Sequence, residues 1–260
     1  MHRRSLVIAS IAAALPATAA AVDNPLVISS EGSLPLLLTV PHDGDEPIGS
    51  VPARTSGATV RDLGTRPLAE KVASLLEQRL KARPRLVIAR FSRKYLDANR
   101  AEQDAMQSVE ALPNYLAYHA EVARHVAELR AAFPQGALLL DIHGQSEDLN
   151  TTFRGTRAGL TVKALVQKHG LDAIQGEKSI LGGLAAKGYN VNPSIGSASP
   201  EEDRRYAGGH TVFLYGSQRP QGIDAIQLEF GKNHRNSWNL AEHFSEAIAA
   251  FLTHYGYLAK

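Results

Sequence analysis

The chain has 260 residues, of which 44% are hydrophobic and 21% are charged, and it contains no cysteine. This composition suits one globular domain with a sizeable core, and it excludes disulfide bonds and thiolate metal ligands, so any metal must be bound by His, Asp or Glu. The net charge is only +2, from 28 basic and 26 acidic residues, which does not indicate a nucleic-acid or anionic membrane surface.

The first 21 residues, MHRRSLVIASIAAALPATAAA, differ from the rest: Arg3 and Arg4 precede an apolar stretch that ends in alanines. This layout predicts a secretory signal peptide over residues 1–21, and the arginine pair loosely resembles the twin-arginine type. A buried N-terminal helix is the alternative, but Pro16 and the alanines favour processing. We therefore expect a periplasmic or secreted protein that does not insert into the membrane, with a single catalytic domain over residues 22–260.

Apolar runs and helical periodicity alternate along this domain. Residues 36–40 (LLLTV) predict a buried strand that ends in the polar loop PHDGDE, and residues 66–83 predict a helix with one apolar face. A second buried strand is expected at 86–91, before the polar segment SRKYLDANR, and a long helix at 114–132. A third strand follows at 137–142. Further helices are expected at 159–168, 177–186 and 238–253, and further strands at 211–215 and 225–230.

Predicted strands alternate with predicted helices, and three of the strands are apolar runs that suit cover on both faces of a sheet. This pattern predicts an α/β three-layer sandwich with a central mixed, largely parallel sheet. Active sites in such sheets lie beyond the carboxyl ends of the strands. Chemically capable side chains fall at four of these ends: His42, the segment 93–100, Asp141 with His143, and Glu229.

The stretch LLLDIHGQ at 138–145 resembles the opening of the metal site of Ser/Thr protein phosphatases. Such a site takes further ligands from Gly-Asp and Gly-Asn-His segments that follow in the chain. Here the only Gly-Asp pair, Gly44-Asp45, lies upstream, and residues 231–234 (GKNH) carry an inserted lysine. A metallophosphoesterase is therefore kept as an alternative.

His42 and His143 form the natural imidazole pair of a mononuclear zinc hydrolase, which needs about three protein ligands and an open position for water. Asp45, Glu46 and Asp62 compete for the third place. Asp62 most closely precedes the predicted helix and is favoured, although a plain helix cap is an equal interpretation of it. Asp141 is expected to orient His143.

Seven segments, taken in order, resemble the N-formylglutamate amidohydrolases, a zinc-dependent, carboxypeptidase-like family. They are VPHDG (40–44), RDLGT (61–65), SRKYLDANR (92–100), LLLDIHGQ (138–145), FRGTRAG (153–159), YAGGHTVFLYG (206–216) and IQLEFGKNHR (226–235). The resemblance implies a carboxypeptidase/phosphorylase-hydrolase-like fold and one Zn²⁺ per chain. It also implies cleavage of an amide in an N-formyl or N-acyl amino acid, or in a peptide-like substrate, that bears a free carboxylate. The family usually has Ser or Gly where this chain has Asp43, which argues against Asp43 as a ligand.

The resemblance also implies a role for each candidate residue. The metal ligands would be His42, Asp62 and His143; the catalytic groups Glu229 as general base, Arg93 and His210; the substrate-binding groups Asn99, Arg100 and Arg154, with Arg157 in support. A solvent-facing Glu229, and ion pairs between Asp97 and the arginines, are the structural alternatives. A catalytically inactive periplasmic binding protein is the remaining functional alternative. Six other histidines are expected at the surface: His119, His125, His169, His234, His243 and His254.

Overall fold

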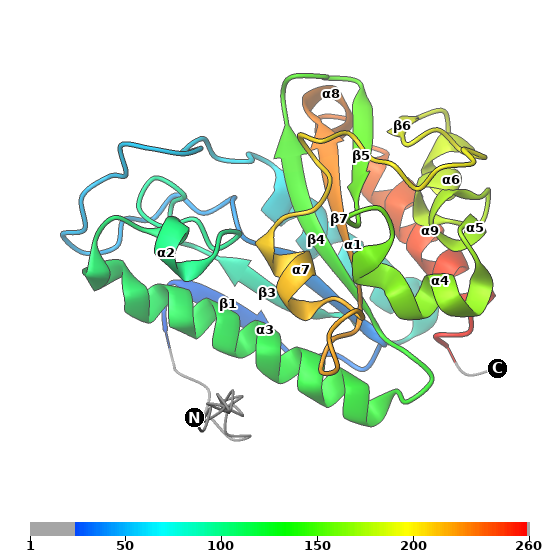
Figure 1. Ribbon diagram of the computed structural model, residues 1–260, viewed down its shortest axis with the longest axis horizontal. Helices are drawn as coiled ribbons and strands as arrows, with labels where there is room; N and C mark the ends of the chain where they lie inside the picture. The colour runs from blue at the N-terminus through cyan, green and yellow to red at the C-terminus, as the bar shows by residue number, and fades with distance from the viewer. Residues whose placement is uncertain (1–23, 259–260) are drawn as a thin grey trace, which may run out of the picture.

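The computed structural model describes residues 24–258, so the expected signal peptide over residues 1–21 lies outside the described residues. Helices cover both faces of a seven-stranded mixed sheet (Figure 1), whose strand order is β1-β3-β2-β4-β7-β5-β6. The expected α/β sandwich with a largely parallel sheet is confirmed. Within residues 24–258, no helix combines the length and the apolar character that crossing a bilayer would require.

The centre of the sheet is parallel and its edges are not. Strands β3, β2, β4 and β7 run parallel, β1 is antiparallel to β3, β5 is antiparallel to β7, and β6 is parallel to β5. The strands span Val27–Ser30 (β1), Leu36–Val40 (β2), Arg85–Ala89 (β3), Leu138–Gln145 (β4), Thr151–Gly155 (β5), Asn190–Asn192 (β6) and Asp224–Gly231 (β7).

The apolar strands are buried on both faces because each face has its own helical layer. Leu36 and Leu38 pack into a core with α1 and α9, whereas Leu37 points into a second core under α3, as the alternation of side chains in a strand requires. The helices are α1 (Thr65–Leu80), α2 (Glu102–Ala105), α3 (Leu112–Ala132), α4 (Lys163–His169), α5 (Asp172–Gln175), α6 (Ile180–Ala185), α7 (His210–Tyr215), α8 (Lys232–Arg235) and α9 (Leu240–His254), with 3-10 turns at Val109–Ala111 and Leu160–Val162.

The expected strand at 211–215 is wrong, since these residues form helix α7. The run TVFLY has the β-branched and aromatic content of a strand. Tertiary contacts override it: Asn99 Oδ1 accepts a hydrogen bond from Thr211 N (2.8 Å) in the first turn, and Val212 and Tyr215 face the second core at helical spacing. The short strands β1, β5 and β6 were not expected from the sequence.

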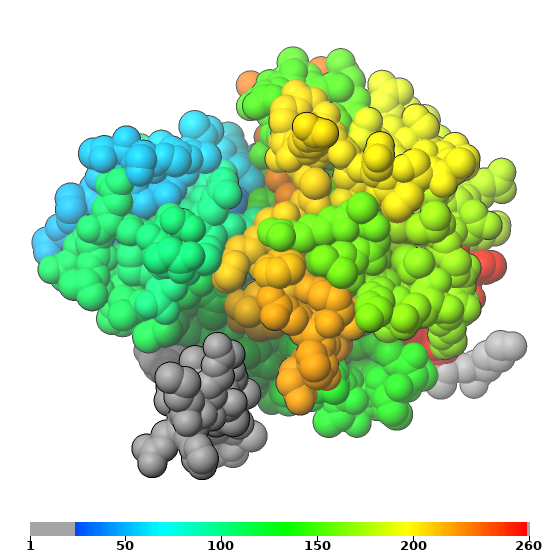
Figure 2. Space-filling model, viewed as in Figure 1, coloured from blue at the N-terminus to red at the C-terminus, as the bar shows by residue number. Residues whose placement is uncertain are grey.

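The fold brings the carboxyl ends of β2, β4 and β7 to one end of the sheet. Strand β4 continues three residues beyond its expected end and pairs in register with β7, so that His143 lies directly beside Glu229. Over this part of the molecule, Figure 2 shows the surface hollowed between the cyan-to-teal segments and the yellow-to-orange segments of the chain.

Candidate active site

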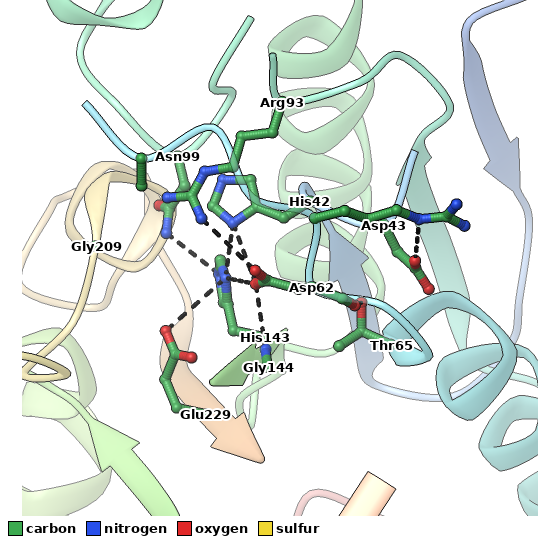
Figure 3. Close-up of polar contacts among 12 residues, drawn as sticks. His42, Asp43, Asp62, Thr65, Arg93, Asn99, His143, Gly144, Gly209 and Glu229 are labelled. Carbon is green, nitrogen blue, oxygen red and sulfur yellow. Dashed lines mark hydrogen bonds and ion pairs between the residues drawn. The ribbon is translucent and has the colours of Figure 1, made fainter. Parts of the chain in front are cut away.

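Three potential metal ligands converge in the interior of the protein (Figure 3). His42 Nδ1 lies 3.1 Å from His143 Nδ1 and 3.3 Å from Asp62 Oδ2, and His143 Nδ1 lies 3.2 Å from the same carboxylate oxygen. All three side chains are buried. The structure thus brings together the three residues that the sequence singled out as ligands.

The other nitrogen of each imidazole faces its own carboxylate. His42 Nε2 is 2.6 Å from Asp97 Oδ1, and His143 Nε2 is 2.8 Å from Asp141 Oδ2. A carboxylate fixes the proton on the Nε2 atom that it faces, so both Nδ1 atoms present lone pairs to the same point. Asp141 in turn accepts a hydrogen bond from Thr39 Oγ1 at 2.6 Å, which fixes the Asp141 carboxylate beside His143.

The geometry of these donors fits a zinc ion. Nitrogen and oxygen ligands at about 2.0–2.2 Å from a tetrahedral zinc lie about 3.3–3.5 Å from one another, close to the separations found here. When both imidazoles are neutral with their protons on Nε2, two lone pairs and a carboxylate oxygen face one another; a metal cation satisfies them, and without a metal an added proton on Nδ1 does. The residues present therefore could hold a metal, with His42, Asp62 and His143 as its ligands.

The local electrostatics favour a positive charge at the same point. Burial by itself lowers the pKa of His143, but Asp141, Asp62 and Glu229 outweigh burial and hold this pKa well above its usual value. Burial by itself raises the pKa of Asp62, yet hydrogen bonds from His143 and His42 outweigh it and keep the carboxyl ionised far below its usual range. The two imidazoles are thus surrounded by the carboxylates of Asp62, Asp97, Asp141 and Glu229.

Of the acids considered for the third ligand, Asp62 is the one that faces the histidines. Asp62 turns its carboxylate inward, where Oδ2 also accepts a hydrogen bond from Gly144 N at 3.2 Å. Asp43 caps helix α1 instead, because its Oδ2 accepts hydrogen bonds from Gly64 N (3.0 Å) and Arg66 N (2.7 Å).

The two remaining acids point away from the imidazoles. Asp45 is exposed and pairs with Arg61 at 2.8 Å, and Glu46 pairs with Arg90. Among the described residues, neither acid contacts His42 or His143.

Glu229 faces the ligands rather than the solvent. Its side chain is 12% exposed, and Oε1 lies 4.0 Å from His143 Nδ1. Burial raises the pKa of this carboxyl, and the neighbouring His143 opposes the rise. A carboxylate beside a metal site, and not itself among the three converging ligands, has the position that a general base requires.

Two arginines reach the site from the segment that follows β3. Arg93 Nε donates to Asp97 Oδ2 at 2.9 Å, and its Nη1 lies 3.6 Å from Asp62 Oδ1, so this guanidinium borders the ligand set. Arg100 is 57% exposed and lies 3.8 Å from Asp97, at the rim. The sequence left both a substrate-binding and a structural role open for these arginines; Arg93 pairs with Asp97 and also borders the ligand set through Asp62.

Two of the expected site residues, Asn99 and His210, are engaged by other groups of the protein. Asn99 was expected to bind substrate, but it is buried, and its Oδ1 accepts from Thr211 N while its Nδ2 lies 3.2 Å from His143 Nε2. His210 begins α7, and its ring lies against His119 and within 3.4 Å of Tyr115 OH. Among the contacts of residues 24–258, none joins the His210 ring to the three ligands.

Arg154, expected to bind substrate, is a structural residue. It is fully buried on β5 and lies on the opposite face of the sheet from Glu229, because its neighbour Phe153 is the residue in register with Glu229. Its Nε donates to Glu202 Oε1 at 2.8 Å, and the rest of the guanidinium faces backbone carbonyls. The pair ties the segment that precedes α7 to the sheet, and Arg157 lies exposed nearby.

Three of the six histidines expected at the surface are buried: His119, His125 and His234. Each has a polar partner that the sequence does not reveal, such as Ala98 O at 3.0 Å for His119 and Ser29 Oγ at 2.9 Å for His125. His169 and His243 are half-buried and His254 is exposed.

The sequence did not indicate three residues that support or border the site. Asp97 was considered only as an arginine partner, and its contact with His42 was missed. Gln227 contacts Glu229, two residues away on the same face of β7. Arg235 joins three segments at the rim, because its guanidinium donates to Leu63 O at 3.0 Å and to carbonyls at the ends of β4 and β7. The period of two along β7 is the one signal that points to Gln227.

Comparisons with solved structures agree with this fold. The chain is similar to an N-formylglutamate amidohydrolase from Ralstonia eutropha JMP134, with a TM-score of 0.55 and 16% identity over 89% of this chain and 97% of the other. It is also similar to a gene product of Agrobacterium tumefaciens, with a TM-score of 0.57 and 18% identity over 88% and 95% of the two chains. No protein-family model and no curated protein sequence matches the chain. The shared fold agrees with the resemblance seen in the seven sequence segments.

Proposed function

We propose that this protein is a zinc-dependent amidohydrolase. It would cleave the amide of an N-formyl or N-acyl amino acid, or of a peptide-like substrate, with a free carboxylate. The observation that carries the proposal is the convergence of His42, Asp62 and His143 with Glu229 beside them. The fold shared with an amidohydrolase supports the same reaction class.

The residues suit the steps of amide hydrolysis. A zinc ion held by His42, Asp62 and His143 would supply Lewis acidity, which lowers the pKa of a water molecule and polarises a carbonyl. Glu229 would take the proton from the attacking water and return it to the leaving amine. Arg93, beside the ligand set, would stabilise negative charge on the carbonyl oxygen.

Arg100 would receive the substrate carboxylate. Its side chain is the exposed guanidinium next to Asp97, and an arginine fork binds a carboxylate in bidentate fashion. Asn99, which the sequence paired with it, is held by protein partners and would act only by supporting the site.

The proposed signal peptide would place this reaction outside the cytoplasm. An exported amidohydrolase would meet short peptide-like amides as well as acylated amino acids, so both classes belong in an assay. N-terminal sequencing of exported protein tests the leader directly: cleavage near residue 21 supports it, and a retained Met1 contradicts it.

The function is tested with a substrate panel of formyl-amino acids, other N-acyl-amino acids, short peptidoglycan-like peptides and an aryl phosphate, each with and without a chelator. We expect amide cleavage that the chelator abolishes and that added zinc restores. Turnover of the aryl phosphate with two bound metals would favour the phosphoesterase. Tight binding of a panel compound without turnover would favour a binding protein.

A further inference from the structure

Gln227 is buried on β7 and lies between the candidate base and a glycine loop. Its side chain shares a face of the strand with Glu229, and its Nε2 donates to Glu229 Oε1 at 3.0 Å. On its other side, Gln227 Oε1 accepts a hydrogen bond from Gly209 N at 2.7 Å. One amide therefore connects the loop that precedes α7 to the carboxylate beside the metal ligands.

The orientation of this amide follows from its partners. The oxygen and nitrogen of a glutamine can exchange places by a flip of the amide, but the Gly209 N–H can only donate. The oxygen of Gln227 must therefore face Gly209, and the amino group must face Glu229. Asn99 Nδ2, at 3.4 Å from the same oxygen, adds a second donor on that side.

The loop is itself held close to these side chains. A Cβ atom at Gly209 would lie 2.2 Å from Asn99 Nδ2, so only glycine allows the backbone to approach. Asn99 Oδ1 then holds the next turn through Thr211 N. Gln227 thus rests on a fixed support, which makes it a rigid hydrogen-bond donor to Glu229.

Only one oxygen of the Glu229 carboxylate is engaged. Within residues 24–258, Oε2 forms no hydrogen bond, whereas Oε1 is held by Gln227. Oε1 is also the oxygen that lies 4.0 Å from His143 Nδ1, so Gln227 holds the carboxylate on the side that faces the ligands and leaves Oε2 without a protein partner.

We propose that Gln227 is a positioning residue, which fixes the Glu229 carboxylate through the Gly209–Gln227–Glu229 hydrogen bonds. This inference rests on the proposed function, because it assigns Gln227 to the base of that reaction. A side chain that acts only by filling space would not need its amino group directed at Glu229.

The test replaces Gln227 by methionine, which has nearly the same shape and lacks both hydrogen-bonding groups. In zinc-loaded protein, we expect Gln227→Met to lower kcat by about 10- to 100-fold, since small misplacements of a catalytic group carry such costs. KM and the zinc content should not change. Gln175→Met is the matched control, because Gln175 is equally buried in α5 and, among the described residues, contacts none of Glu229, Asn99 and Gly209.

Crystal structures of Gln227→Met with and without zinc give a readout that does not depend on activity. We expect the Glu229 carboxylate to leave its position while His42 and His143 keep theirs. An unmoved Glu229, a kcat equal to that of the unchanged protein, or an equal loss in Gln175→Met would overturn the proposal. If the unchanged protein binds zinc and cleaves no amide, the proposed function fails and the crystal structures alone decide the role of Gln227.

Discussion

The Nδ1 atoms of His42 and His143 lie 3.1 Å apart, while the Nε2 atoms of the same rings face two different buried carboxylates, Asp97 and Asp141. Each carboxylate keeps the proton of its imidazole on the outer nitrogen. In the neutral imidazoles, the inner nitrogens are left as two lone pairs, and Asp62 adds a carboxylate oxygen between them. A cation removes the resulting repulsion, which is why we interpret this relationship as a metal site.

Replacement of Asp97 by asparagine should weaken metal binding. An amide oxygen still accepts a hydrogen bond from His42 Nε2, but it carries no charge, so the imidazole becomes a poorer ligand. We expect a loss of about 10- to 100-fold in zinc affinity, the usual range for such supporting groups. Titration against a competing chelator measures it. Asp203→Asn, in an exposed pair with Arg205, is the control, and an unchanged affinity in Asp97→Asn would contradict the role given to Asp97.

Arg154 should matter for stability and not for turnover. Arg154→Met removes one partner of a buried ion pair and leaves Glu202 among backbone donors, which costs roughly 3–5 kcal/mol of unfolding free energy. Urea denaturation measures the loss, and kcat and KM should keep their values in the folded protein. A higher KM without a loss of stability would contradict this prediction and would support the substrate-binding role that the sequence motif of Arg154 implied.

The buried histidines should make the fold sensitive to acid. Burial, assisted by the charge of His210, lowers the pKa of His119 to about 4. Burial and the charge of Arg124 likewise lower the pKa of His125 to about 4. Between pH 6.5 and pH 4 the unfolded chain therefore binds more protons than the folded protein, so acid destabilises the fold by about 1.4 kcal/mol per pH unit for each such histidine.

His119→Gln isolates one of these two contributions. Its amide can still donate to Ala98 O, but it does not titrate, so the variant should lose stability less steeply than the unchanged protein between pH 6.5 and pH 4. Urea unfolding at several pH values gives both slopes. Equal slopes would show that His119 is not the neutral, buried group that the structure describes.

The sequence predicted those parts of the site that depend on local pattern. Strands β2 and β4 are apolar runs and β7 alternates apolar and polar residues, and parallel strands bring their carboxyl ends to one edge, so the pattern alone places His42, His143 and Glu229 together. Asp62 was chosen for its place before a helix. The sequence could not show that Asp43, from the preceding loop, would cap that helix and leave Asp62 free to face the histidines.

The errors arose where contacts distant in sequence decide the outcome. Arg154 shares a segment with family-like residues, but the pleat of β5 turns it away from the site, towards Glu202, 48 residues later. His125 looks like a surface residue on a helix, yet Ser29, 96 positions earlier, gives it a buried partner. Residues 211–215 have strand-like composition, and Asn99 holds them as a helix.

The most direct test of the account measures zinc content and amide turnover on the same samples of unchanged protein, Glu229→Gln and His143→Ala. We predict one zinc per chain with turnover for the unchanged protein, and one zinc without turnover for Glu229→Gln, because the amide cannot take the proton. His143→Ala should have neither. Full turnover by Glu229→Gln, or amide cleavage by unchanged protein that contains no metal, would contradict the account.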